Sequence, residues 1–226
     1  MRANLAAFQQ YQVFLNYPFD EDAESLSMAL HFAVVAAGLL PVCAMDMTSP
    51  DKPRLSMLVD AITSCQYSAH DLSRCTGEGN GNLARFNMPV EMGMALFHAL
   101  HNQSSSHRCA FFVTGQHDYK RFASDLSGLD PYFYDSDDVL LLRMYEWLRD
   151  NLNAAFITRP SAEIGDIYSE FKTRLLLLRG AGKDGRPSHH ESQELMYQIA
   201  AARGLWDWRA NRAGQLTFKE VPLSWK

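Results

Sequence analysis

The sequence predicts an α/β protein whose mainly parallel sheet is followed by a helical extension. In the first half of the chain, short apolar runs typical of strands alternate with longer stretches of helical periodicity. In the second half, helical periodicity dominates. Strands that alternate with helices indicate parallel pairing and a sheet covered on both faces. We therefore expect an α/β domain over residues 1–134 and a helical extension with a Trp-containing tail over residues 135–226.

Four apolar runs are the expected strands. Pro18 follows the first run and stops it. Pro41 lies inside the second run and weakens that prediction, because proline donates no hydrogen bond to a neighbouring strand. The four runs cover residues 11–15, 39–44, 66–72 and 109–113.

The expected helices are recognised by their ends as well as by their periodicity. Acidic side chains suit the start of the first helix, which has one apolar face and ends at Gly38. Pro53 and Pro89 begin the second and third helices. Ser188 and Glu191 form a capping box for the last helix. Two further helices are expected around residues 141–148 and 164–178.

The composition predicts a folded chain without the excess of basic residues that is typical of nucleic-acid-binding proteins. Of 226 residues, 47% are hydrophobic and 21% charged, and the formal net charge is −5. Duplex nucleic acid is therefore not an expected partner, although a local cluster of Arg would suit a small anion. The most apolar stretch, residues 30–43, is interrupted by Gly38 and Pro41 and is too short to span a bilayer. We expect a cytoplasmic protein with no membrane partner.

The cysteines and histidines give no reason to expect a metal. The four cysteines lie far apart, with no C-x-x-C pair, and Cys43 and Cys65 lie in or beside apolar stretches typical of buried thiols. The paired His189 and His190 have no carboxylate or Cys at a spacing suited to zinc. We expect a reducing compartment, no metal ligands and no cofactor.

Three segments follow expected strands, where an open α/β sheet places its ligands. They are residues 16–20, 70–74 and 85–95. We expect substrate-binding residues in all three. These are Tyr17, Phe19, Asp20, Arg74, Arg85, Asn87 and Met88.

Glu91 is the strongest candidate for chemistry. It lies in the first turn of the third helix, where free N–H groups and the macrodipole favour an ionised carboxylate. Such a carboxylate can attack an anomeric carbon or stabilise an oxocarbenium-like transition state. The alternative is purely structural, because Glu is favoured at the third position of any helix. Gly93 and Ala95 on the same helix are expected to allow close packing on the sheet.

The other candidates also have two interpretations each. Asp71 can protonate a leaving base and Arg74 can hold a phosphate, or they can cap a turn and form a surface ion pair. Tyr17 and Phe19 can stack on a base or cover the edge of the sheet. The Gly-rich stretch at residues 77–81 lacks the spacing of a phosphate-binding loop.

Two of the segments resemble known families. Residues 13–20, Val-Phe-Leu-Asn-Tyr-Pro-Phe-Asp, resemble the opening strand and loop shared by TIR domains and nucleoside 2-deoxyribosyltransferases. Residues 89–95, Pro-Val-Glu-Met-Gly-Met-Ala, resemble the Glu-Leu-Gly-x-Ala helix start of the transferases, with Met92 in place of Leu. The resemblance covers residues 11–113. The transferases' Asp-x-Gly-Thr loop is absent, and residues 85–89 read Arg-Phe-Asn-Met-Pro instead.

The resemblance implies a flavodoxin-like three-layer domain that cleaves or transfers an N-glycosidic bond. The substrate would be a nucleotide, a nucleoside or NAD. Glu91 would attack the sugar, as the matching glutamate does in the transferases, and Asp71 would assist departure of the base. Arg74 or Arg85 would hold a phosphate. The alternative is a non-catalytic TIR-like module that senses a nucleotide or assembles into a homo-oligomer.

Overall fold

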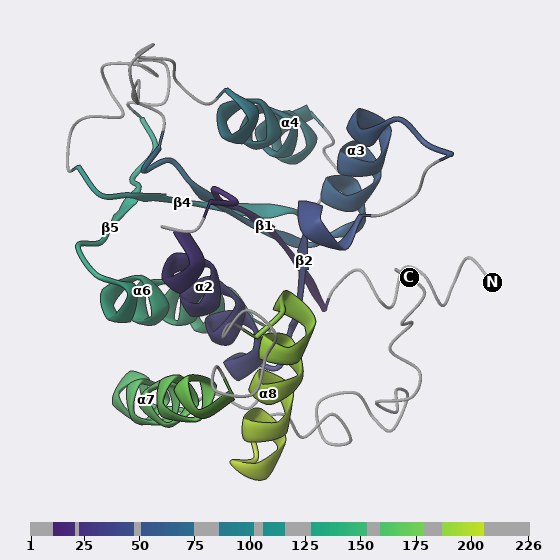
Figure 1. The fold of residues 1–226 in the computed structure, drawn as a ribbon. Coiled ribbons are helices and arrows are strands. Elements are labelled where there is room, and N and C mark those ends of the chain that lie inside the picture. The colour runs from purple at the N-terminus through teal and green to yellow at the C-terminus, as the bar shows by residue number, and fades with distance from the viewer. Residues whose placement is uncertain are drawn as a thin grey trace, which may run out of the picture.

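The structure, a computed structural model, describes residues 11–20, 23–47, 51–74, 86–101, 106–115, 128–152, 159–178 and 187–205. Its centre is one five-stranded sheet in the order β2-β1-β3-β4-β5, in which every pair of neighbours is parallel. Figure 1 shows the sheet between two layers of helices, which confirms the predicted α/β class. The strands are β1 (Gln12–Asn16), β2 (Leu40–Cys43), β3 (Tyr67–Asp71), β4 (Arg108–Val113) and β5 (Tyr132–Phe133).

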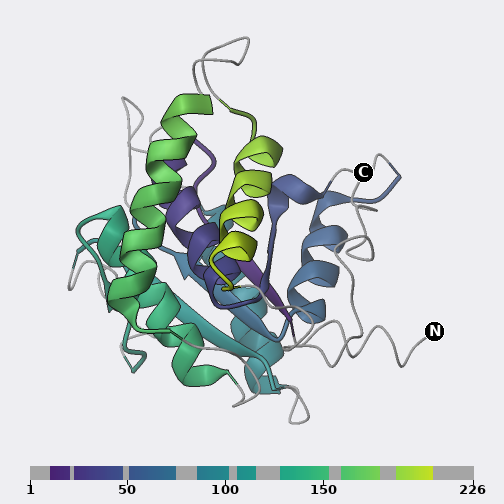
Figure 2. The same cartoon turned by 90° about the horizontal axis from the view of Figure 1, so that it is seen from below.

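The helices cover both faces of the sheet. α3 (Arg54–Ser64) and α4 (Asn87–His101) lie on one face, and α2 (Glu24–Ala36) and α6 (Asp137–Asn151) lie on the other. Outside α2 lie α7 (Ser161–Leu178) and α8 (His189–Ala202), as the view from below shows (Figure 2). A short 3₁₀ helix, η2 (Ala44–Asp46), follows β2.

The position of β2 explains how a strand accommodates Pro41. β2 pairs only with β1, with Pro41 opposite Val13, and forms an edge of the sheet. Proline is tolerated at an edge because its missing N–H then faces away from any partner strand. The two-residue β5 was not predicted, because two residues are too few to form an alternating pattern.

Helix α2 is buried almost all round, beyond the single apolar face that the sequence predicted. Eleven of its 13 residues are buried. The reason is that α6 and α8 pack against the sides of α2 that do not face the sheet. Its Phe32 contacts Tyr168 and Phe171 of α7, with ring centroids 5.1 and 5.3 Å apart.

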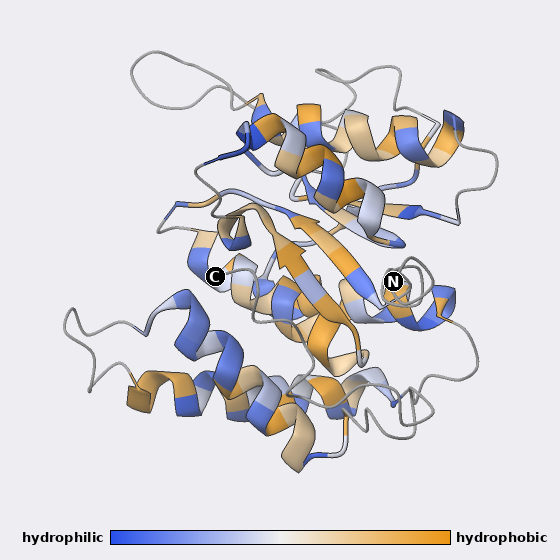
Figure 3. Ribbon diagram, turned by 90° about the vertical axis from the view of Figure 1, so that its right-hand side faces the viewer, coloured by the Kyte–Doolittle hydropathy of each residue, from blue (hydrophilic) through white to orange (hydrophobic). Residues whose placement is uncertain are grey.

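The helical extension shares one hydrophobic core with the sheet. A single cluster of buried side chains contains Val13 and Leu15 of β1 together with Leu141, Ile164 and Ile199 of the last three helices. Figure 3 shows strands coloured largely as hydrophobic between helices of mixed colour. The tryptophan tail, residues 206–226, lies outside the described residues.

Among the described residues, no helix combines the length and the apolar character needed to cross a bilayer.

Candidate functional site

The strand order places a switch point between β1 and β3. From β1 the chain passes by α2 to β2 on one side, whereas β3 and β4 continue on the other side. The connections after β1 and β3 therefore leave toward opposite faces, which opens a crevice at the carboxyl ends of these strands. β1 ends at Asn16 and β3 at Asp71, so the predicted segments all begin at this edge.

Asn16 connects the end of β1 to β3 and α4 at this edge, a role that the sequence did not predict. Its buried Nδ2 donates to the carbonyl oxygen of Met88 at 2.7 Å and lies 3.0 Å from Nδ1 of His70. The first bond holds the first turn of α4 against the end of β1. The second fixes the ring of His70, because Nδ1 accepts and the proton must then be on Nε2.

A chain of buried polar side chains continues from His70 along β3. His70 Nε2 lies 2.9 Å from Ser68 Oγ, and Ser68 Oγ lies 2.9 Å from His107 Nε2. His107 Nδ1 donates to the carbonyl oxygen of Cys65 at 2.8 Å. Because a carbonyl only accepts, each bond in the chain points the same way, from Asn16 toward Cys65. Burial lowers the pKa of His70 to about 3 and also lowers that of His107, so both rings are neutral at pH 7.

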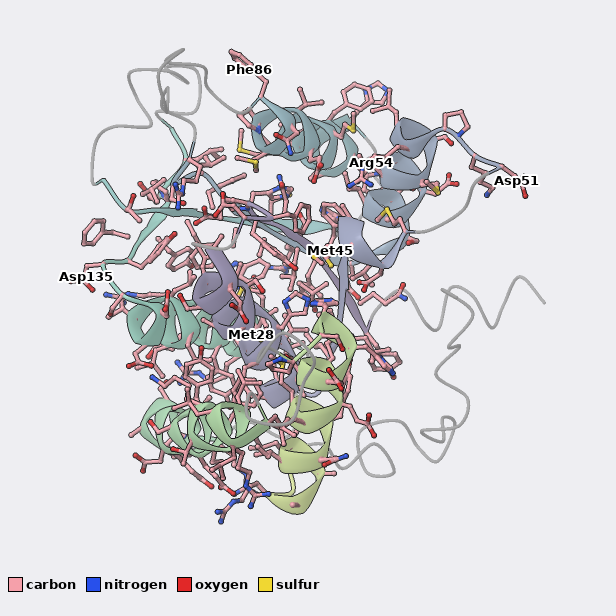
Figure 4. The ribbon with its side chains drawn as sticks, viewed as in Figure 1. Met28, Met45, Asp51, Arg54, Phe86 and Asp135 are labelled. Carbon is pink, nitrogen blue, oxygen red and sulfur yellow. The ribbon has the colours of Figure 1, made fainter. Side chains whose placement is uncertain are left out.

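Glu91 lies on the buried face of α4, with Met88, Met92 and Ala95. Only 5% of its surface is exposed. Burial raises the pKa of Glu91 to about 7, and the positive charge of Arg54 partly opposes the rise. Arg54 lies where α3 faces α4 (Figure 4). The sequence predicted that Glu91 lies in the first turn of a helix beginning at Pro89 and is kept ionised there. The helix instead begins at Asn87, so Glu91 lies past the first turn, and burial raises its pKa.

Asp71 is fully buried, and both oxygens of its carboxylate accept hydrogen bonds from nearby residues. Oδ2 accepts from Tyr134 Oη at 2.6 Å, and Oδ1 accepts from the backbone N–H of Ser73 at 3.1 Å and from the Ser73 hydroxyl. Burial raises the pKa of Asp71, against the lowering effect of these bonds and of Arg74. The bonds to Ser73 are those of a capped turn, the structural alternative that the sequence left open.

The structure does not bring Asp71 and Glu91 together. Side chains alternate along a strand, so Asp71 shares a face with Tyr67 and Ala69. Those two residues pack in the core beneath α2 and α6. Glu91 instead belongs to α4, on the opposite face.

The loops after β1 and β3 approach each other through an ion pair. Arg74 Nη2 lies 3.7 Å from Asp20 Oδ1. Phe19 is 38% exposed beside them, and its ring contacts that of the buried Tyr17 at a centroid distance of 4.8 Å. At the start of α4, Asn87 is exposed and Met88 is buried. The predicted Arg85 lies outside the described residues.

An apolar groove lies between the outer sides of α3 and α4. Its volume is about 510 Å³. Gly93 lines it and is exposed, with no heavy atom within 4 Å of the position that a Cβ would take. The prediction that Gly93 packs on the sheet is therefore wrong, whereas Ala95 is fully buried. The lining residues are Val59, Ile62, Thr63, Val90, Gly93, Met94, Phe97, His98 and His101.

A second polar cluster lies at the carboxyl end of β2, beside the loop that follows β1. One donor atom from each of His31, Cys43 and His189 lies within 4.8 Å of the other two. The sequence excluded His189 as a metal ligand because no partner stood at a suitable spacing. Cys43 and His189 are 146 positions apart, so only the fold brings them together.

Comparison with models of protein families and with curated proteins gives no match to this chain.

Proposed function

We propose that this protein binds a nucleotide, nucleoside or NAD-type molecule at the β1/β3 switch point and cleaves or transfers its N-glycosidic bond. The observation that supports this most directly is the state of Glu91, a buried carboxyl group at the fifth residue of α4, the helix after β3. Its pKa of about 7 lies at the working pH of an enzyme. Desolvated carboxyl groups of this kind are uncommon outside functional sites.

The ionised form of Glu91 is the reacting form in this proposal. A carboxylate oxygen forms a bond to the anomeric carbon of the sugar, or stabilises positive charge there. The C–N bond breaks and its electron pair leaves with the base, which takes a proton from water when the substrate is a nucleoside or nucleotide. Water or an acceptor base then takes the sugar from Glu91. When NAD is the substrate, nicotinamide leaves as a neutral molecule and needs no added proton.

The remaining residues of the edge hold the substrate. Arg74 offers a cation beside the crevice, and Asn87 stands at the start of α4, where free backbone N–H groups suit a phosphate. The exposed ring of Phe19 offers a face to a base. Asp71 faces away from Glu91, so its role here is to position the loop that carries Arg74.

A second candidate function is supported by a different surface. Large apolar side chains are exposed along the α3–α4 side, including Phe97 at 64% and Leu100 at 80%. Exposed apolar rows of this kind are typical of surfaces that bind a protein partner. This supports the alternative of a non-catalytic, TIR-like adaptor module that assembles with itself.

The test is release of free base by the wild-type protein and by Glu91→Gln. Each is incubated with NAD and with a panel of nucleosides and nucleotides, and free base is measured by chromatography. Glu194→Gln, at an exposed position on α8, is the matched control. We expect release by the wild type and by Glu194→Gln, and a loss of at least about 100-fold in Glu91→Gln.

Two outcomes would reject the enzymatic proposal. One is equal release by Glu91→Gln and the wild type. The other is no release from any substrate at high or low protein concentration. In the second case, a mass measurement that shows oligomers dissolved by Phe97→Ser would favour the assembly module instead.

A further inference from the structure

The cluster formed by His31, Cys43, Asp46 and His189 has the composition of a metal site. We propose that these four side chains bind one Zn²⁺ ion, which fastens the start of α8 to the end of β2. The four residues come from α2, β2, η2 and α8. This site lies beside the loop after β1 but uses none of the residues to which the proposed function assigns a role.

His31 has one nitrogen ready for a metal. Its Nδ1 lies 2.8 Å from the carbonyl oxygen of Ser27, and because a carbonyl only accepts, Nδ1 carries the proton. Nε2 therefore bears a lone pair. This atom is buried and has no hydrogen-bond partner among the described residues. A ring whose other nitrogen donates to a backbone carbonyl is the usual arrangement of a metal-binding histidine.

Cys43 and His189 meet beside this nitrogen. Cys43 is fully buried at the end of β2, and its Sγ lies 4.0 Å from Nε2 of His189. The rings of His31 and His189 are 5.1 Å apart at their centroids and nearly perpendicular. Perpendicular rings can direct two lone pairs at one point without a clash. In Figure 4, Met45, which lies between Cys43 and Asp46, stands close to the upper end of α8.

Asp46 completes a set of four donors. Its Oδ1 lies 3.6 Å from His189 Nε2, and its Oδ2 accepts from the backbone N–H of Cys43 at 2.9 Å. That second bond holds the carboxylate in place, as outer partners of ligands do. Tyr17 borders the same cluster, with its hydroxyl buried and its ring 5.5 Å from that of His31.

The donor atoms of His31, Cys43 and His189 lie within 4.8 Å of one another, so they and Asp46 must move inward to surround a tetrahedral ion. Ligand atoms around tetrahedral Zn²⁺ are roughly 3.3–3.6 Å apart, given bonds of about 2.0–2.3 Å. His189 Nε2 lies 3.6 Å from Asp46 Oδ1 and 4.0 Å from Cys43 Sγ, so these two pairs are already close to that range. Gln193 Nε2 now lies 3.0 Å from His189 Nε2, so binding requires this amide to turn toward solvent.

Charge and donor type favour Zn²⁺ over Mg²⁺ or Ca²⁺. A thiolate, two imidazoles and one carboxylate are borderline or soft donors, whereas the hard cations prefer oxygen alone. One thiolate and one carboxylate also neutralise the two charges of the ion. The thiolate and carboxylate can therefore stay charged in this buried place only when the ion is bound. The Cys43 thiol releases its proton to solvent when the metal binds. His189 and Asp46 are partly exposed, so an ion can reach the site from water.

The experiment uses the full chain with any affinity tag removed, stripped with a chelator under reducing conditions. Co²⁺ is titrated in as a coloured substitute for Zn²⁺. We expect one equivalent to give strong visible bands of tetrahedral Co²⁺ and a near-ultraviolet thiolate-to-metal band, both abolished by one equivalent of Zn²⁺. Zn²⁺ should also slow amide hydrogen exchange in α8.

Matched variants separate this site from adventitious binding. Cys43→Ser and His189→Gln should weaken Co²⁺ binding by more than about 100-fold, beyond what the loss of an outer partner causes. Cys109→Ser and His190→Gln change the same residue types outside the cluster and should bind as the wild type does. Because His189 is partly exposed at a helix start, His189→Gln tests the site even where Cys43→Ser disturbs folding.

Three results would overturn the proposal. They are a pale octahedral Co²⁺ spectrum in the wild type, full binding by His189→Gln, or equal loss of binding in His190→Gln.

Discussion

The amide nitrogen of Asn16 lies 2.7 Å from the carbonyl oxygen of Met88, a residue 72 positions further along the chain. This bond joins the end of β1 to the first turn of α4, at the edge of the sheet where Glu91 is held. A substitution of Asn16 should therefore alter both the stability of the fold and the position of Glu91.

We expect Asn16→Ala to lower the free energy of unfolding by about 2–3 kcal/mol, because Met88 and His70 each lose a buried donor. Urea denaturation measures the change. Ser56→Ala removes a bond on an exposed helix start and should alter the value by less than about 0.5 kcal/mol. A similarly small effect of Asn16→Ala would show that water replaces the lost donor.

The second prediction concerns the pH dependence of stability at Glu91. Its pKa in the folded protein, about 7, lies above the ordinary value of 4.5, so ionisation opposes folding. The contribution of Glu91 to stability is complete below pH 4.5 and is lost as the pH rises through 7. Glu91→Gln cannot ionise, so above pH 7 it should be more stable than the wild type by up to roughly 3 kcal/mol.

Urea denaturation at several pH values tests this difference. Near pH 4.5 the two proteins should unfold alike, because Glu91 is then protonated in the folded state. Glu194→Gln should match the wild type throughout. A constant gap between Glu91→Gln and the wild type at every pH would mean that the folded pKa is not raised.

The third prediction concerns the pH dependence of base release. If the ionised form of Glu91 reacts, the rate should rise with pH through about 7. Arg54 lowers the pKa of Glu91, so Arg54→Gln should move the midpoint of the profile to higher pH. Lys52→Gln removes a nearby cation paired with Asp60 and should leave the midpoint in place. A rate that falls through the same pH range would make Glu91 a proton donor instead.

The fourth prediction contrasts two glycines. Gly93 lies inside α4 with open space at its Cβ position, so Gly93→Ala should stabilise the protein by about 1 kcal/mol through helix propensity. Gly204 has φ of 63°, so Gly204→Ala should destabilise it by about 1 kcal/mol. Thermal unfolding of both variants gives the two signs. Destabilisation by Gly93→Ala would mean that the α3–α4 groove closes over this position.

Local patterns were sufficient for most of the elements. The runs that became β1 to β4 are long enough to be recognised as strands. Pro53 and Pro89 were predicted to begin their helices, but Pro53 is the N-cap of α3, and α4 begins two residues before Pro89. The burial of α2 on all sides depends on helices more than 100 residues away, which no window of the sequence contains.

In the candidate site, too, some features follow from local sequence and others depend on long-range packing. The carboxyl ends of parallel strands lie at the same edge of a sheet, so the sequence alone can place Asn16, Asp71 and the start of α4 at one edge. Asp71 and Glu91 lie on opposite faces of the sheet. This follows from the strand order, which the sequence does not reveal. The contact between Cys43 and His189 follows from the docking of α8, and no spacing rule anticipates it.

The enclosure of α2 has a consequence for how the chain folds during synthesis. When the first 134 residues have left the ribosome, α2 still lacks α6, α7 and α8, which cover its outer side. Its apolar residues would then face water, in an intermediate prone to association. The sheet therefore cannot reach its final packing before the residues after 134 are made, and folding is completed only after most of the protein has been synthesised.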